Sequence, residues 1–389
     1  MQHSEGSVGL GQTDALHPRG GQDGQLEGPR APSSGPRVLL RNLAGQDWVV
    51  LGLHLYLNVR MFALPSSPEV STARAYTFGL LSAVLFVLLL TRGQMMGAGP
   101  LRSAIYRFGL FIPTVSTYFA MRHVMRALDP VLLDAPLLAI DRALFGETPS
   151  LLMEPLVTPL SVEFFAFFYY GYYALLGTHL FGTLLFDDGR RAYELLFGAA
   201  WVVAVGHCVY TLVPGVGPYA HCADLFTKPL EGGFWWRQVL DAVTAAGAAL
   251  DIFPSLHTAY PSFLALHSLR YRKTSPYRYS VIPVCIIATV IVISTMFLRW
   301  HYAIDVVAGL LVAYSAGSVA SWAYDRFDSD EARAQQRARQ PAGAAERQPA
   351  WEPLMPAGMS RPDYVWLIGV LSVHLLVIVL ASVLGARAH

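Results

Sequence analysis

The stretch Arg299–Gly309 reads RWHYAIDVVAG and leads into an apolar run over residues 302–323. A run of about 20 mostly apolar residues is long enough to cross a bilayer as a helix. His301 and Asp305 are four residues apart, so they share one face of this predicted helix. A carboxylate there can hold one imidazole nitrogen as N–H, leave the other free to attack, and stabilise positive charge on the ring. The spacing therefore predicts a catalytic pair at the start of a membrane helix.

A second stretch, DIFPSLHTAY (Asp251–Tyr260), begins another apolar run over residues 255–271. Pro254 suits the first turn of a helix, where its missing N–H costs nothing, and His257 then lies in that turn. Helix N-termini attract phosphate through unpaired N–H groups and a positive dipole end, and the Ser255 hydroxyl is a further donor. The chain between the two histidines runs to a basic loop and back. Both histidines are therefore predicted at the same membrane level.

The composition of the whole chain agrees with a membrane protein. Of 389 residues, 54% are hydrophobic and 14% are charged, and the mean hydropathy is +0.40. Soluble proteins carry roughly 25% charged residues, so this chain has more apolar surface than a soluble fold can bury. The net charge of +1 gives no reason to expect a nucleic-acid partner. We expect an all-α polytopic membrane protein.

Apolar runs predict about nine transmembrane helices. The runs lie at 47–64, 75–91, 103–125, 161–186, 192–213, 255–271, 279–298, 302–323 and 363–385. Lys and Arg are enriched in cytoplasmic loops. Nine alternating spans place every basic cluster on that side: Arg30–Arg41, Arg92–Arg107, Arg190–Arg191 and Arg270–Arg278. The N-terminus is then predicted in the cytoplasm, and both histidines lie at the outer face. The Ala-, Arg- and Gly-rich composition favours a bacterial plasma membrane, with a periplasmic site.

PSLH followed by HYAIDVVAG resembles the type-2 phosphatidic acid phosphatase superfamily, in which a PSGH-like motif and an SRxxxxxHxxxD motif form the site. The segments AIDRALFGETP (139–149) and TLVPGVGPY (211–219) resemble its inositol phosphorylceramide synthase branch. The resemblance implies a core of the six-helix type that uses no metal and no cofactor. It also implies that His301 is the nucleophile that forms a phosphohistidine and that Asp305 orients it. His257 would protonate the leaving alcohol and later activate the acceptor.

Composition and apolar runs, together with the resemblance over roughly residues 140–323, divide the chain into five predicted parts. They are a disordered cytoplasmic tail (1–45), N-terminal transmembrane helices (46–130), a phosphatidic acid phosphatase-like catalytic core (131–324), a cytoplasmic linker (325–362) and a last transmembrane helix (363–389). The tail is polar and lacks the apolar core of a secretory signal.

Departures from the phosphatase pattern point to the substrate. Leu256 stands where that pattern has Gly, Thr295 stands where it has Arg, and the upstream KxxxxxxRP motif is not recognisable. A phosphomonoester carries about −1.5 to −2 charge at neutral pH, whereas a diester carries about one. A site with fewer cations therefore suits a diester, and Arg299 is predicted to compensate. The predicted phosphate- and substrate-binding residues are Ser255, Arg299, Thr295, Tyr302, Pro218, Tyr169 and Tyr173.

The leading hypothesis is a lipid phosphotransferase that moves a phospho-headgroup, for example inositol phosphate, from a phospholipid to ceramide or diacylglycerol. A lipid phosphate phosphatase or a phospholipase-C-like hydrolase would share the first half-reaction and use water as acceptor. A transporter or scaffold would keep the helices without the activity. Two histidines and an aspartate can also bind zinc, but no third imidazole or thiol is obviously placed beside them. The expected partners are the lipid substrates and the bilayer.

Overall fold

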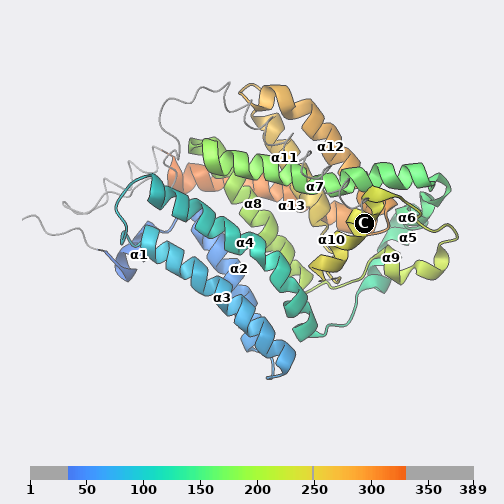
Figure 1. The fold of residues 1–389 in the computed structure, drawn as a ribbon, viewed down its shortest axis with the longest axis horizontal. Coiled ribbons are helices and arrows are strands. Elements are labelled where there is room, and N and C mark those ends of the chain that lie inside the picture. The colour runs from blue at the N-terminus through green and yellow to red at the C-terminus, as the bar shows by residue number, and fades with distance from the viewer. Residues whose placement is uncertain (1–33, 248, 330–389) are drawn as a thin grey trace, which may run out of the picture. The chain divides into compact units, whose positions relative to one another are not determined.

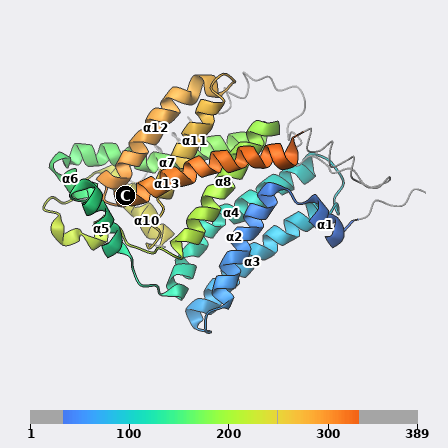
Figure 2. The same ribbon diagram turned by 180° about the vertical axis from the view of Figure 1, so that it is seen from behind.

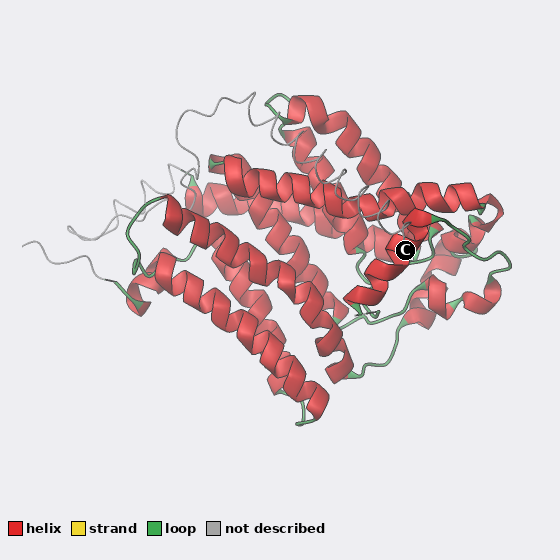
Figure 3. Ribbon diagram, in the orientation of Figure 1, coloured by secondary structure: helices red, strands yellow, loops and turns green. Residues whose placement is uncertain are grey.

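The computed structural model describes residues 34–247 and 249–329. Over these residues the chain forms helices joined by loops (Figure 3), with one isolated bridge between Gly215 and Asp251. The α-helices are α1 (Pro36–Asn42), α2 (Gly45–Phe62), α3 (Pro68–Thr91), α4 (Pro100–Leu128), α5 (Asp134–Phe145), α6 (Pro149–Leu152), α7 (Pro159–Phe186), α8 (Gly189–Tyr210), α9 (Pro218–His221), α10 (Phe234–Ala246), α11 (Leu256–Arg270), α12 (Tyr277–Phe297) and α13 (Ala303–Ala323). Short 3₁₀ segments η1 (Glu154–Leu156) and η2 (Ala223–Leu225) and a π-helical turn η3 (Tyr324–Asp328) complete them.

The long helices begin at residues with clear start signals. Proline is the first residue of α3, α4 and α7, where its missing N–H is not needed. The Ser67 hydroxyl accepts the Val70 N–H at the start of α3, and the Thr158 hydroxyl accepts the Ser161 N–H at the start of α7. Such caps satisfy amides that have no partner within the helix.

Four helices of the described part are long and apolar enough to cross a membrane: α3, α8, α12, and α13 together with η3. They indicate an integral membrane protein. Helices α2, α4, α7 and α11 also coincide with predicted spans, but they contain more polar residues or are shorter. The ninth predicted span, 363–385, lies outside the described residues, as do residues 1–33 of the predicted tail and most of the predicted linker. The full count of nine stays a prediction.

Helix α11 packs against α8, α12 and α13 (Figure 1). Two glycines allow this close packing. A Cβ on Gly309 of α13 would come within 2.5 Å of the Ser255 carbonyl oxygen, and one on Gly206 of α8 would come within 2.5 Å of the Leu256 side chain. Helices α2, α3 and α4 lie side by side in both views, and α2 and α4 contact α8 (Figures 1 and 2).

Buried Glu194 joins the ends of α8, α11 and α13 that lie farthest from His257 and His301. Its carboxylate accepts hydrogen bonds from Arg190 Nε (2.7 Å), Arg270 Nη2 (3.0 Å) and the Tyr271 hydroxyl (2.8 Å). Both arginines also donate to the Ser321 hydroxyl near the end of α13. The predicted cytoplasmic basic clusters at 190–191 and 270–278 are thus neighbours in the fold. Which membrane face they occupy stays a prediction.

The loops predicted at the outer face contain helices that the apolar runs did not predict: α5, α6, α9 and α10. Glu163 of α7 caps α10, because its carboxylate accepts the N–H groups of Gly233, Trp235 and Trp236 at 2.6–3.0 Å. Helix α1 lies within the segment predicted as a tail, so helical structure begins before the predicted boundary at residue 46.

Candidate active site

The start of α13 is held by two carboxylates. Asp141 of α5 accepts the N–H groups of Ala303 (2.9 Å) and Ile304 (3.0 Å), and Asp305 accepts the N–H of Tyr302 (2.9 Å). These acids satisfy the first amides of the helix, which have no partner within it. The first turn of α13 is therefore fixed by protein groups and presents His301, just before it, in a defined position.

His301 and Asp305 form the pair that their spacing predicts. The Nδ1 atom of His301 lies 3.4 Å from Oδ2 of Asp305, and both residues are buried. The loop before α13 is closed by the Thr295 carbonyl, which accepts the N–H groups of Trp300 (3.0 Å) and His301 (3.2 Å). The carboxylate thus faces one nitrogen of the imidazole.

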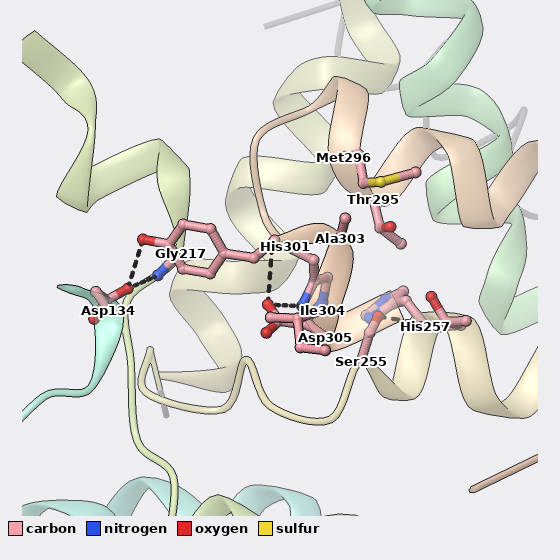
Figure 4. A network of polar contacts seen from close by, with 12 residues as sticks. Asp134, Gly217, Ser255, His257, Thr295, Met296, His301, Ala303, Ile304 and Asp305 are labelled. Carbon is pink, nitrogen blue, oxygen red and sulfur yellow. Dashed lines mark hydrogen bonds and ion pairs between the residues drawn. The ribbon is translucent and has the colours of Figure 1, made fainter. Parts of the chain in front are cut away.

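His257 lies in the first turn of α11, next to this pair (Figure 4). Ser255 caps α11 by accepting the Thr258 N–H (3.3 Å), and the Ser255 N–H donates to the Asp305 carbonyl (3.0 Å). This backbone bond joins the first turns of α11 and α13 directly. His257 and His301 interact electrostatically as a result.

Two tyrosine rings of α7 enclose the imidazole of His257. The Tyr169 ring stacks on it with centroids 4.3 Å apart and planes 9° apart, and the Tyr172 ring lies 4.2 Å away. The Tyr169 hydroxyl is 3.4 Å from Nδ1 of His257, whereas Nε2 is buried and has no hydrogen-bond partner in the described part of the chain. Tyr173 is more distant and exposed, with its ring 6.5 Å from His257.

The Arg299 side chain contacts residues of the neighbouring loops and does not lie free beside the histidines. Its Nη2 donates to the Lys228 carbonyl (2.7 Å) and lies 3.6 Å from Glu154, and its guanidinium lies 3.7 Å from the centre of the Phe226 ring. Its backbone is left-handed, with φ of 66°, which turns the side chain out of the regular path between α12 and α13. Burial lowers the pKa of Arg299, and the Glu154 charge opposes that change.

The two departures from the phosphatase pattern have structural roles. The Thr295 side chain is buried and donates to the Val292 carbonyl (2.7 Å), so its hydroxyl belongs to the end of α12. The Leu256 side chain packs against Gly206 of α8. Neither residue supplies a positive charge.

Pro218 and Tyr302 belong to a rigid support beside the histidines. Asp134 of α5 accepts the Gly217 N–H (2.8 Å) and the Tyr302 hydroxyl (3.1 Å), as Figure 4 shows. Gly217 has φ of 78°, and a Cβ there would lie 2.3 Å from the Trp300 carbonyl oxygen, so the position requires glycine. Pro218 follows as the buried first residue of α9. This support holds the loop that precedes His301.

Three acids near the site were not among the predicted site residues: Asp134, Asp141 and Asp251. Asp134 and Asp141 position the loops and α13 from more than 80 residues away in the sequence, a distance over which spacing carries no signal. Asp251 begins the DIFPSLH stretch and interacts electrostatically with His301. Its place before the histidine motif was visible in the sequence, but its partial burial was not.

The family model described as the PAP2 superfamily matches residues 135–319, which include every residue predicted as catalytic. Members of that superfamily are phosphatases or phosphotransferases, so the match suggests such activity on lipid phosphates. No curated protein and no solved structure matches the chain. Within the described residues, no group of three or more His, Cys, Asp or Glu side chains is arranged to hold a metal ion.

Proposed function

We propose that this protein is a membrane lipid phosphotransferase that moves a phospho-headgroup from a phospholipid to a lipid alcohol such as ceramide or diacylglycerol. The observation that carries the proposal is the meeting of His257 and His301 at the starts of α11 and α13, with Asp305 behind His301. One imidazole then serves as the nucleophile and the other as the proton carrier.

The first half-reaction breaks the donor phospholipid. Because Nδ1 of His301 faces Asp305, its Nε2 is the nitrogen that attacks the phosphorus. A bond forms between Nε2 and phosphorus, and the bond from phosphorus to the diacylglycerol oxygen breaks. His257 enters this step as an imidazolium. Its Nε2 atom gives its proton to that oxygen, so diacylglycerol leaves as a neutral alcohol and His257 becomes neutral. Asp305 stabilises the positive charge on the His301 ring.

The second half-reaction repeats these steps in reverse with a new alcohol. His257 takes the proton from the acceptor hydroxyl, whose oxygen attacks the phosphorus. The bond between phosphorus and His301 breaks, and the electron pair returns to the imidazole. The headgroup phosphate is then attached to the acceptor lipid, and both histidines regain their starting protonation states.

The cation content of the site supports a diester donor. Thr295 supplies no charge at the position where the phosphatase pattern has Arg, and the Arg299 guanidinium contacts Glu154 and the Lys228 carbonyl. A site with so few cations stabilises a diester, with about one negative charge, better than a monoester with nearly two. The apolar helices around the site favour lipid donors and acceptors.

The test is a transfer assay with the purified full-length protein in lipid nanodiscs. The donors are phosphatidylinositol and phosphatidylethanolamine labelled in the headgroup, and the assay is run with and without ceramide. We expect labelled headgroup phosphate on ceramide and release of diacylglycerol. Release of inorganic phosphate from phosphatidic acid, without headgroup transfer to ceramide, would contradict the proposal and favour the phosphatase alternative.

A further inference from the structure

The two histidines of the site differ in what stabilises their positive charge. Asp305 lies 3.4 Å from His301, whereas no carboxylate in the described part of the chain forms a salt bridge with His257. His257 also lies in the first turn of α11, where the positive end of the helix dipole disfavours a cation. The proposed reaction nevertheless requires His257 as an imidazolium in its first step. That positive charge therefore needs stabilisation by groups other than acids.

Two tyrosine rings of α7 contact the imidazole of His257 at stacking distance. Tyr169 and Tyr172 are three residues apart, so they share one face of α7. The Tyr169 ring is nearly parallel to the imidazole, with centroids 4.3 Å apart, and the Tyr172 ring lies 4.2 Å from it with planes 33° apart. Both tyrosines are buried. An aromatic face attracts a cation, most strongly where water is excluded, so the two rings favour the charged form of His257.

The Tyr169 hydroxyl adds a polar contact to the same imidazole. Its oxygen lies 3.4 Å from Nδ1 of His257 and can accept the N–H that the imidazolium carries there. The Nε2 atom has no hydrogen-bond partner in the part of the chain that the structure describes. Nδ1 is thus held by the protein, and Nε2 is the nitrogen left to exchange a proton with a substrate.

We propose that Tyr169 and Tyr172 are positioning residues that stabilise the imidazolium form of His257, as Asp305 does for His301. In the first half-reaction the Nε2–H bond of His257 breaks, the proton passes to the diacylglycerol oxygen, and the electron pair stays on Nε2. The rings raise the fraction of protein in which that proton is present when the donor binds. Tyr169, which the sequence predicted as a substrate-binding residue, then acts through His257.

This inference rests on the proposed function but concerns only the step that transfer and hydrolysis share. The experiment compares two donors in a single turnover: phosphatidylinositol, and the same lipid with sulfur in place of the glycerol oxygen bonded to phosphorus. A thiol is a much stronger acid than an alcohol, so a thiolate leaves without a proton donor. The released diacylglycerol and its thiol analogue are measured by mass spectrometry of quenched samples.

The variants remove one ring at a time. Tyr169→Leu and Tyr172→Leu should each slow release of diacylglycerol roughly 10- to 30-fold, the effect of one desolvated cation–π contact. Release of the thiol from the sulfur donor should fall less than about twofold, because that step needs no proton from His257. Tyr172→Phe keeps the ring and should retain most of the rate with the oxygen donor. Tyr169→Phe loses only the hydroxyl and should lie between the wild type and Tyr169→Leu.

Tyr170→Leu is the matched control on the same helix, because the Tyr170 ring contacts Tyr173 and Trp235. It should leave the ratio of the two rates unchanged. Equal losses with both donors in Tyr169→Leu and Tyr172→Leu would overturn the inference, since a purely structural role slows both. A full rate with the oxygen donor in these two variants would also overturn it. Release of diacylglycerol without transfer to ceramide would contradict the proposed transfer and leave the inference intact.

Discussion

Two polar clusters occupy opposite ends of α11 and α13, and they differ in how completely their buried polar atoms are hydrogen bonded. In the Glu194 cluster, both carboxylate oxygens accept hydrogen bonds, from Arg190, Arg270 and Tyr271. His257, His301 and Asp305, which we propose as the catalytic residues, form the other cluster, called the catalytic cluster below. Within the described part of the chain, three of its buried polar atoms have no hydrogen-bond partner: His257 Nε2, His301 Nδ1 and Asp305 Oδ1.

The difference in hydrogen bonding distinguishes a cluster that stabilises the fold from one that we propose to react. Buried polar atoms are normally paired, because an unpaired one costs free energy. The Glu194 cluster follows that rule and holds three helices together. The catalytic cluster breaks it at His257 Nε2, the atom that exchanges a proton with the alcohols in the proposed reaction, and within the pair of His301 and Asp305. We therefore expect changes in the catalytic cluster to alter turnover more than stability, and changes in the Glu194 cluster to do the reverse.

The largest effect is expected for His301→Gln, which keeps a polar side chain but removes the nucleophile. Headgroup transfer should fall roughly 10⁶-fold, as when a catalytic nucleophile is removed from other enzymes. The unfolding temperature should stay close to that of the wild type, because His301 Nδ1 makes no hydrogen bond in the resting site. The measurements are the transfer assay and thermal unfolding in detergent.

His221→Gln is the control, because His221 is exposed on α9 in the loop region near the site. It should keep normal turnover. If His301→Gln retained more than about a tenth of the activity, the assignment of the nucleophile would be wrong, since another group would then have to attack the phosphorus.

The sequence predicted the long helices of this fold better than the short helices in the loops between them. Long apolar runs locate α7, α8, α12 and α13 to within a few residues, since a bilayer requires continuous apolar length. Helix α10 escaped prediction as a span because it is a short amphipathic helix in the loop between α8 and α11, capped by Glu163 from α7. Caps of this kind join residues that are far apart in the sequence, so no local sequence pattern predicts them.

The same limit applies to the candidate site. The spacing of His301 and Asp305 placed them on one helix face, and the structure brings the two side chains to 3.4 Å. Arg299 was expected to compensate for the missing cations, and only its position in the sequence suggested this role. Its direction depends on a left-handed backbone and on Glu154 and Lys228, which are 145 and 71 residues away. That prediction still awaits a test by mutation.

A smaller effect on turnover is expected for Gly309→Ala. The new Cβ would come within 2.5 Å of the Ser255 carbonyl oxygen, which belongs to backbone and cannot rotate away. Helix α13 must then shift from α11, and His257 and His301 move apart. A displacement near 1 Å can cost about 10²-fold in rate. We expect a loss of that order in kcat, together with about 1–3 kcal/mol of destabilisation from overpacking.

Gly317→Ala is the matched control on the same helix. A Cβ at Gly317 meets nothing within 4 Å, so activity should be unchanged. Equal turnover by Gly309→Ala and Gly317→Ala would show that the contact between α11 and α13 does not set the distance between the histidines.

The smallest effect on turnover, and the clearest effect on stability, is expected for Glu194→Gln. The glutamine side chain keeps the size of Glu194 but loses the charge that binds Arg190 and Arg270. Glu194 is 3% exposed, whereas its arginine partners are 37% and 46% exposed. Solvent screens the charges of the arginines, so removing the Glu194 charge costs less stability than it would in a fully buried pair. We expect a destabilisation of about 2 kcal/mol, measured by chemical unfolding in detergent.

Glu147→Gln, which breaks the exposed pair with Arg142, is the control and should cost less than about 1 kcal/mol. The folded fraction of Glu194→Gln should turn over like the wild type, because the catalytic cluster lies at the other end of α11 and α13. A fall in kcat without a fall in stability would place Glu194 in the reaction and remove the distinction between the two clusters.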